Sequence, residues 1–254
     1  MSSHCRAVLG ILIAVGLPTP LDAADREQLD GLRASLSADT GDCPQGGLYS
    51  FRLTLSNAGS ERVQASLVLT RFSLGYLKIL YRRPPEPFTE LTYPRDWYPS
   101  PFPHPGTTMV DLGPGESRGF DLVVGADPGH RRAVFREPGE YEIKVVLRSV
   151  TRESAWTLET EGLMVRVVPM DDQFQNLSAL WDYEMVALAQ GDLRMERLGE
   201  LAPRGLRIIE AAPESRYARA LRTELLRFLD MTPGETSRDP QLLEIRNRLK
   251  TGAP

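Results

Sequence analysis

The stretch that decides the fold is EPGEYEIKVVL, which spans residues 137–147. It opens with a Pro-Gly pair, where proline fixes φ and glycine accepts positive φ, so the chain is expected to turn there. Apolar side chains then recur at every second position, at Tyr141, Ile143, Val145 and Leu147. This period is typical of a β-strand that buries one face. The segment therefore predicts a turn followed by a half-buried strand.

The same period of two recurs along residues 31–169. Clusters containing Gly, Pro or Asn separate the alternating segments at short intervals, and no helical period intervenes. This pattern favours an antiparallel sandwich of seven to nine strands over a parallel α/β sheet. The predicted strands cover residues 32–38, 49–56, 63–69, 77–81, 110–112, 120–124, 141–147, 156–158 and 163–167.

Three short motifs resemble those of bacterial immunoglobulin-like domains. They are LSNAG at residues 55–59, LGPGES at residues 112–117 and PGEY at residues 138–141. The last motif is also similar to the tyrosine corner, in which a tyrosine that opens a late strand hydrogen-bonds back across the preceding loop. The resemblance implies an antiparallel immunoglobulin-like β-sandwich over residues 31–169. It is specific to a fold and not to a function.

After residue 169 the apolar period becomes helical. A first helix is expected from Asp171 or Asp172 to Gly191. Further helices are expected from Asp192, over residues 215–230, and from residue 239 onward, with Pro203 at the start or kink of one of them. Four or five short helices in antiparallel array are therefore expected.

One helical junction resembles those of tetratricopeptide-type repeats. It is AAPESRYA at residues 211–218, although this pattern does not recur at the period of about 34 residues that such repeats have. The resemblance implies a helical-hairpin domain. With the β part before it, the chain is predicted to be mainly β with an α tail, the helical domain covering residues 170–251.

The first 23 residues have the order of a secretory signal peptide. His4 and Arg6 precede an apolar run at residues 7–15, and Leu21-Asp22-Ala23 resembles a small-residue cleavage site. The run is shorter than the roughly 20 apolar residues that span a bilayer, so an uncleaved anchor is the weaker alternative. We therefore expect an exported protein, periplasmic or extracellular, with no transmembrane segment after cleavage.

Composition narrows the possible functions. A net charge of −4 over 254 residues gives no general attraction to nucleic acid. Cleavage would remove Cys5 and leave Cys43 as the single cysteine, which excludes an internal disulfide and a zinc site built on thiolates. Cys43 is expected to be an inert or partly buried thiol; pairing with a partner chain and a nucleophilic role are the alternatives. No metal or cofactor is expected.

Residues 84–105 are the most unusual segment. Prolines alternate there with aromatic residues, and a connection this long is either functional or disordered. One interpretation is a recognition loop for a protein partner, and the other is a cover that folds back over an open sheet edge. As a recognition loop it would bind through its exposed aromatic side chains. These candidate partner-binding residues are Phe88, Tyr93, Trp97, Tyr98 and Phe102.

Few motifs for catalysis can be found in the sequence. HExxH and phosphate-binding loops do not occur, and the turn at residues 127–132, DPGHRR, is either an anion-binding turn or a solvated loop. We therefore predict a non-enzymatic interaction or structural protein that binds another envelope or extracellular protein. The alternatives are an envelope-acting hydrolase, a protease inhibitor and a carbohydrate-binding module.

Overall fold

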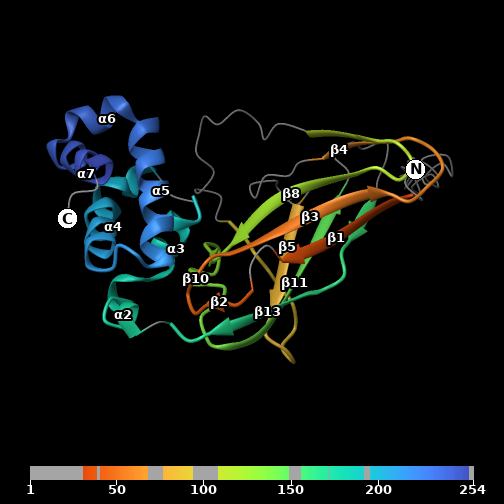
Figure 1. Cartoon of the computed structure of the whole chain (residues 1–254), viewed down its shortest axis with the longest axis horizontal. Coiled ribbons are helices and arrows are strands. Elements are labelled where there is room, and N and C mark those ends of the chain that lie inside the picture. The colour runs from red at the N-terminus through yellow and green to blue at the C-terminus, as the bar shows by residue number, and fades with distance from the viewer. Residues whose placement is uncertain are drawn as a thin grey trace, which may run out of the picture.

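The computed structural model describes residues 31–38, 41–67, 77–93, 108–148, 156–170, 172–191 and 195–251. The predicted signal peptide, residues 1–23, lies outside these ranges. In the described chain, strands run as far as residue 168 and helices follow from residue 172 (Figure 1).

Two larger sheets form the β part. One has the order β1-β3-β8, and the other has the order β2-β13-β11-β5-β6 with β12 paired to β11. Two small antiparallel ladders, β4 with β7 and β9 with β10, complete it. The strands are β1 (Leu32–Ala38), β2 (Cys43–Pro44), β3 (Tyr49–Asn57), β4 (Val63–Leu67), β5 (Leu77–Arg82), β6 (Thr89–Glu90), β7 (Thr108–Leu112), β8 (Ser117–Val124), β9 (Ala126–Asp127), β10 (Arg132–Ala133), β11 (Gly139–Arg148), β12 (Thr157–Glu159) and β13 (Leu163–Val168).

The alternating residues of both larger sheets bury their side chains in one hydrophobic core. Phe51 and Leu53 of β3 belong to it, as do Ile143 and Val145 of β11, and all four are fully buried. Burial of apolar area is the main stabilising contribution of such a core. The apolar residues that recur at every second position are therefore those on the inward faces of the two sheets.

The expectation of purely antiparallel pairing is wrong at one edge. β2 runs parallel to β13, with Cys43 opposite Val167 and Pro44 opposite Val168. Pro44 has no backbone N–H to donate, and a proline is tolerated in a sheet only where no further ladder bond is required. This two-residue strand therefore occupies the edge of its sheet.

Tyr141 makes the hydrogen bond that the tyrosine-corner resemblance implies. Its Oη accepts from the backbone N–H of Glu137 at 3.3 Å, and its ring packs edge-on against Phe135 with centroids 5.4 Å apart. Burial raises the pKa of Tyr141, so the phenol remains protonated at neutral pH. The bond ties the turn before β11 to the start of that strand.

Tyr141→Phe tests this bond. The variant leaves the N–H of Glu137 without its acceptor while keeping the ring, so the free energy of unfolding is expected to fall by about 1 kcal/mol. Urea denaturation followed by fluorescence measures the change. An unchanged midpoint would mean that water replaces the hydroxyl without loss.

Cys43 is a free thiol in the core of the β part, with 1% of its surface exposed. Burial raises its pKa to about 12, whereas a thiol in an unfolded chain ionises near 8.5. In the folded protein we expect a thiol-disulfide reagent at pH 8 to react at least 100-fold more slowly than in denaturant. Because the folded pKa is raised, stability relative to Cys43→Ala should also fall as the pH rises above about 8.5. Fast labelling of the folded chain would contradict the assignment.

The helices form the second part of the chain. They are α2 (Asp172–Gln175), η2 (Ser178–Leu180), α3 (Tyr183–Ala189), η3 (Met195–Arg197), α4 (Leu198–Ala211), α5 (Arg216–Met231), α6 (Pro233–Arg238) and α7 (Pro240–Thr251). Their apolar faces meet in a core of their own, to which Met185, Leu221 and Ile245 contribute. Pro203 lies inside α4 and not at its start.

The single helix expected from residue 171 or 172 to residue 191 is wrong. The structure divides that segment into α2, η2 and α3. Asp182 has an extended backbone, and its side chain accepts hydrogen bonds from the N–H groups of Glu184 and Met185, which starts α3 anew. The preceding Trp181 thereby leaves the helical path and turns toward the β part.

A polar and aromatic seam joins the helices to one end of the β part, beside β2 and β10 (Figure 1). Trp181 Nε1 donates to the carbonyl of Gly46 at 2.8 Å, and Tyr217 Oη donates to that of Gln45 at 2.9 Å. The side-chain oxygen of Gln190 accepts from the N–H of Ala126, whose side chain is buried in the helical core. The two parts therefore share buried contacts.

Among the described residues, no helix combines the length and apolar character needed to cross a membrane.

Candidate functional site

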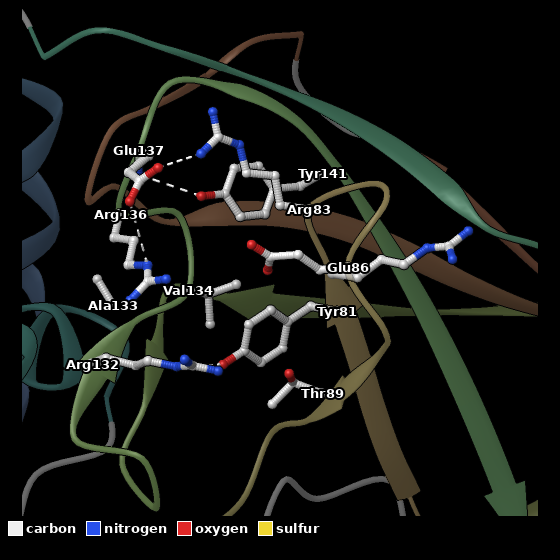
Figure 2. Close-up of a pocket in the computed structure, with 11 residues that line it drawn as sticks. Tyr81, Arg83, Glu86, Thr89, Arg132, Ala133, Val134, Arg136, Glu137 and Tyr141 are labelled. Carbon is white, nitrogen blue, oxygen red and sulfur yellow. Dashed lines mark hydrogen bonds and ion pairs between the residues drawn. The ribbon is translucent and has the colours of Figure 1, made fainter.

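The site with the most distinctive chemistry is a pocket of about 60 Å³ beside the tyrosine corner (Figure 2). Its side chains come from β5, β6 and the segment between them, and from β10, the segment after it and the start of β11. We call it the arginine pocket because four of its lining residues are arginines. The charged lining residues are Arg82, Arg83, Glu86, Arg132, Arg136 and Glu137.

The pairing of β5 with β11 brings the two segments together. Tyr81 lies opposite Ile143, and Arg82 lies opposite Glu142, with which it makes an ion pair at 2.5 Å. Tyr81 is a buried residue of an alternating strand, so its ring anchors the floor of the pocket in the core. Residues about 50 positions apart in the sequence therefore line one cavity.

A carboxylate from the chain itself already occupies one side of the pocket. Glu137 makes an ion pair with Arg83, and its Oε1 lies 3.9 Å from Nε of Arg136 (Figure 2). Arg83 Nη2 also donates to the carbonyl of Pro138 at 3.2 Å. The two guanidinium groups thus flank one carboxylate, an arrangement that arginine favours through its forked donors.

A buried hydrogen-bond network fixes the other side. Tyr81 Oη donates to Asp127 Oδ2 at 2.5 Å, and Arg132 Nε donates to Tyr81 Oη at 3.1 Å. Burial, reinforced by the hydrogen bond to Asp127, raises the pKa of Tyr81, so this phenol stays neutral. Because Tyr81 is held by Asp127, the orientation of the Arg132 guanidinium is set before any ligand arrives.

Asp127 also organises the turn at residues 127–132. Its carboxylate is fully buried and lies 2.6 Å from Nδ1 of His130, and it accepts longer bonds from the N–H groups of Thr92 and His130. Arg131 has a left-handed backbone with a φ of 51°. A buried carboxylate is tolerated when several donors satisfy it. This turn is thus held in one conformation from inside.

Ion pairs are unevenly distributed among the charged lining residues. Within the described chain, Arg82, Arg83 and Arg136 each have a carboxylate within 4.0 Å. Neither Arg132 nor Glu86 has an oppositely charged partner within that distance among the described residues. The two terminal nitrogens of Arg132 are therefore donors that make no ion pair within the described part of the chain.

Of the five predicted partner-binding residues, the structure describes two. Phe88 is half-buried beneath two cations, with the Arg82 guanidinium 4.4 Å and Lys144 Nζ 5.2 Å from its ring centroid. Tyr93 packs partly buried against the β core, and Gln190 donates to its hydroxyl at 3.5 Å. The two side chains lie in different surroundings, and neither lines the arginine pocket.

The other three candidates, Trp97, Tyr98 and Phe102, lie outside the described residues. Of the four arginines of the pocket, only Arg132 belongs to a segment for which the sequence left anion binding open, the turn at residues 127–132. Arg82, Arg83 and Arg136 were not predicted, since each had the appearance of an ordinary solvated charge.

Within the described ranges, no three His, Cys, Asp or Glu side chains cluster in a way that would hold a metal ion. His130 has Nδ1 bound to Asp127, and no serine, threonine or cysteine hydroxyl or thiol lies in hydrogen-bond contact with its ring in that part of the chain. The chemistry that this arrangement offers is hydrogen bonding and ion pairing to a charged group.

Comparison with known proteins gives structural matches alone, because no family model and no curated protein matches the chain. One match is the CARDB domain of a Pyrococcus furiosus protein, at 12% identity over 54% of this chain and 94% of that one, with a TM-score of 0.26. Another is the C-terminal domain of wzt, at 9% identity over 54% of this chain and 74% of that one, with a TM-score of 0.31. A β-glucosidase from Erythrobacter marinus matches at 14% identity over 54% of this chain, with a TM-score of 0.28, and this chain spans 15% of its length.

Proposed function

We propose that this protein is an exported, non-enzymatic interaction protein that binds a protein partner in the cell envelope. Its β part is the scaffold, and its contact surface combines residues 84–105 with the adjoining arginine pocket. The helical part serves as a second docking site or as a cap on the scaffold. The signal-like order of residues 1–23 supports export.

The scaffold proposed is an immunoglobulin-like β-sandwich with a helical-hairpin domain attached. Three features support it: two sheets contribute to one core, most pairings are antiparallel, and Tyr141 forms its hydrogen bond back to Glu137. Rigid scaffolds of this kind present binding residues on the loops between their strands. The connections after β5 and after β10 both contribute side chains to the arginine pocket.

One observation carries the proposal. Four arginines from two distant parts of the chain, residues 82–83 and 132–136, meet in a pocket, and the proline-rich segment contributes Glu86 and Thr89 to its lining. Arginine and aromatic residues are the types enriched where protein partners bind most strongly. A surface of this composition suits a protein partner.

The test compares the intact chain with a variant in which Trp97, Tyr98 and Phe102 are replaced by serine. Both are exported from a bacterial host, purified and used to capture proteins from envelope extract, and the captured protein is then purified for a direct measurement of Kd. We expect the triple variant to bind at least tenfold more weakly, since buried aromatic anchors contribute more than 1 kcal/mol each. Mass spectrometry of the exported chain should give Ala24 as its first residue.

The control replaces one exposed residue on another strand, away from the proposed contact surface. Arg33→Gln on β1 should leave Kd within twofold of the intact chain. If the intact chain captures no protein that rebinds after purification, the interaction role is wrong. If the triple variant binds as tightly as the intact chain, residues 84–105 are not the contact surface.

A further inference from the structure

The size of the arginine pocket limits what can enter it. Its volume is about 60 Å³, which is room for a few water molecules. Pockets that enclose whole small molecules measure about 300–1,000 Å³. The cavity therefore admits one functional group of a larger partner and not a sugar ring.

The charge of the pocket selects the sign of that group. Its lining carries four guanidinium groups against the two carboxylates of Glu86 and Glu137. Glu137 makes ion pairs with Arg83 and Arg136, and Glu142, which does not line the pocket, makes an ion pair with Arg82. Arg132 remains as the cation without a carboxylate within 4.0 Å among the described residues. An incoming anion would complete that pattern.

The orientation of Arg132 is fixed from below. Its Nε donates a hydrogen bond to the hydroxyl of Tyr81, and this hydroxyl in turn donates to the carboxylate of buried Asp127. Figure 2 shows Arg132 reaching the hydroxyl of Tyr81 at the edge of the pocket. A guanidinium held through Nε can still offer its two terminal nitrogens, and a donor held in place loses less entropy on binding.

The lining already gives one example of a bound carboxylate. Glu137 places its carboxylate between Arg83 and Arg136, which shows that arginines of this pocket hold a group of this kind. Both lining phenols, Tyr81 and Tyr141, are neutral and do not repel an anion.

We propose that the arginine pocket binds one carboxylate, the side chain of a glutamate or aspartate of the protein partner, through the terminal nitrogens of Arg132. This inference rests on the proposed function and names the chemistry of the contact. The partner then presents an acidic residue toward the pocket.

The direct test uses the intact chain with ¹⁵N-labelled arginine and a tetraglutamate peptide as the probe. The Nε–H resonance of Arg132 is expected to shift in a saturable way, and tetraglutamine is expected to leave it unmoved. Arg132→Gln should weaken binding of the peptide at least tenfold, which corresponds to one charge-assisted hydrogen bond. Arg132→Lys keeps the charge without the fork and should give an intermediate loss.

Arg33→Gln on β1 is the matched control, because it removes the same charge from an exposed site in a different sheet. Equal losses in Arg33→Gln and Arg132→Gln would overturn the proposal, as would an Arg132 resonance that does not move. Tighter binding of inorganic phosphate than of tetraglutamate would overturn the assignment to a carboxylate. If Arg132→Gln lowers the melting temperature by more than a few degrees, its loss of binding can result from loss of structure. The shift of the Arg132 resonance in the intact chain then decides whether the carboxylate binds there.

The same variants separate this inference from the proposed function. A captured partner that binds Arg132→Gln as tightly as the intact chain leaves the interaction role standing and removes the carboxylate contact. A saturable shift at Arg132 without any captured partner would support the carboxylate site and contradict the proposed interaction role.

Discussion

Asn57→Ala is expected to lower the free energy of unfolding by about 3–5 kcal/mol, because one buried side chain satisfies three backbone groups. Asn57 Nδ2 donates to the carbonyls of Glu61 and Leu112 at 2.6 and 3.0 Å, and its Oδ1 accepts from the N–H of Gly59 at 2.9 Å. The residue is 1% exposed. Alanine leaves these groups buried or half-buried without partners, at about 1–3 kcal/mol for each fully buried one.

The position of Asn57 explains why its replacement would destabilise several strands and not one turn alone. It ends β3, and its own backbone bonds to Glu116 and Gly115 in the turn before β8. Its side chain reaches β7 through Leu112 and the segment just before β4 through Glu61. Through its side chain and its backbone, this one residue therefore connects β3 and β7 with the segments that lead into β4 and β8. Two of the motifs that suggested an immunoglobulin-like domain meet at this residue.

Urea denaturation measures the change, with two comparisons. Asn57→Asp keeps the acceptor for Gly59 but places a carboxylate oxygen against two carbonyls, so its loss should be at least as large as that of alanine. Asn247→Ala, on the exposed side of α7, should change stability by less than 0.5 kcal/mol. A loss below 1 kcal/mol for Asn57→Ala would show that water enters the turn and replaces the amide.

The long strands could be predicted from sequence because each has one buried face. The alternation at residues 49–56 and 141–147 corresponds to β3 and β11 within one or two residues at each end. The strands β2, β6, β9 and β10 were not predicted. Each has two residues, too few to show a period, and each is held by a partner distant in the chain or by a turn.

The break at Trp181 shows where local patterns stop being informative. Apolar residues at positions 174, 177, 181, 185 and 188 fit one helix, and the capping ability of Asp182 competes with that pattern. The structure favours the cap because Trp181 gains the carbonyl of Gly46, 135 residues earlier. No window of sequence contains both partners of that bond.

The sequence offered the turn at residues 127–132 as a candidate for anion binding, but the assembly of the arginine pocket could not be predicted, for the same reason. Arg82 and Arg132 come together only after β5 pairs with β11 and the turn after β9 folds back onto Tyr81. The buried role of Asp127 was equally hidden, since an Asp-Pro-Gly sequence is typical of a solvated turn. A charge pattern in sequence indicates which residues are available, and the sheet pairing determines which of them meet.

Trp181→Ala is expected to cost about 3–5 kcal/mol and to loosen the seam between the two parts of the chain. Trp181 is 7% exposed, and its ring packs against Phe174 and Tyr217 with centroids 5.4 and 5.0 Å away. Removing the indole opens a cavity between these rings and leaves the carbonyl of Gly46 without its donor. Both neighbouring rings belong to the helical side of the seam, so local opening should begin there.

Hydrogen exchange separates this local effect from a general loss of stability. In Trp181→Ala, amides of α3 should exchange faster by a larger factor than amides of β11. Trp156→Ala is the matched control, because Trp156 packs partly buried against the core of the β part. There the amides of β11 should be affected at least as much as those of α3. Equal acceleration of both elements in Trp181→Ala would mean that the helices and sheets unfold as one cooperative unit, and that the seam is as strong as either core.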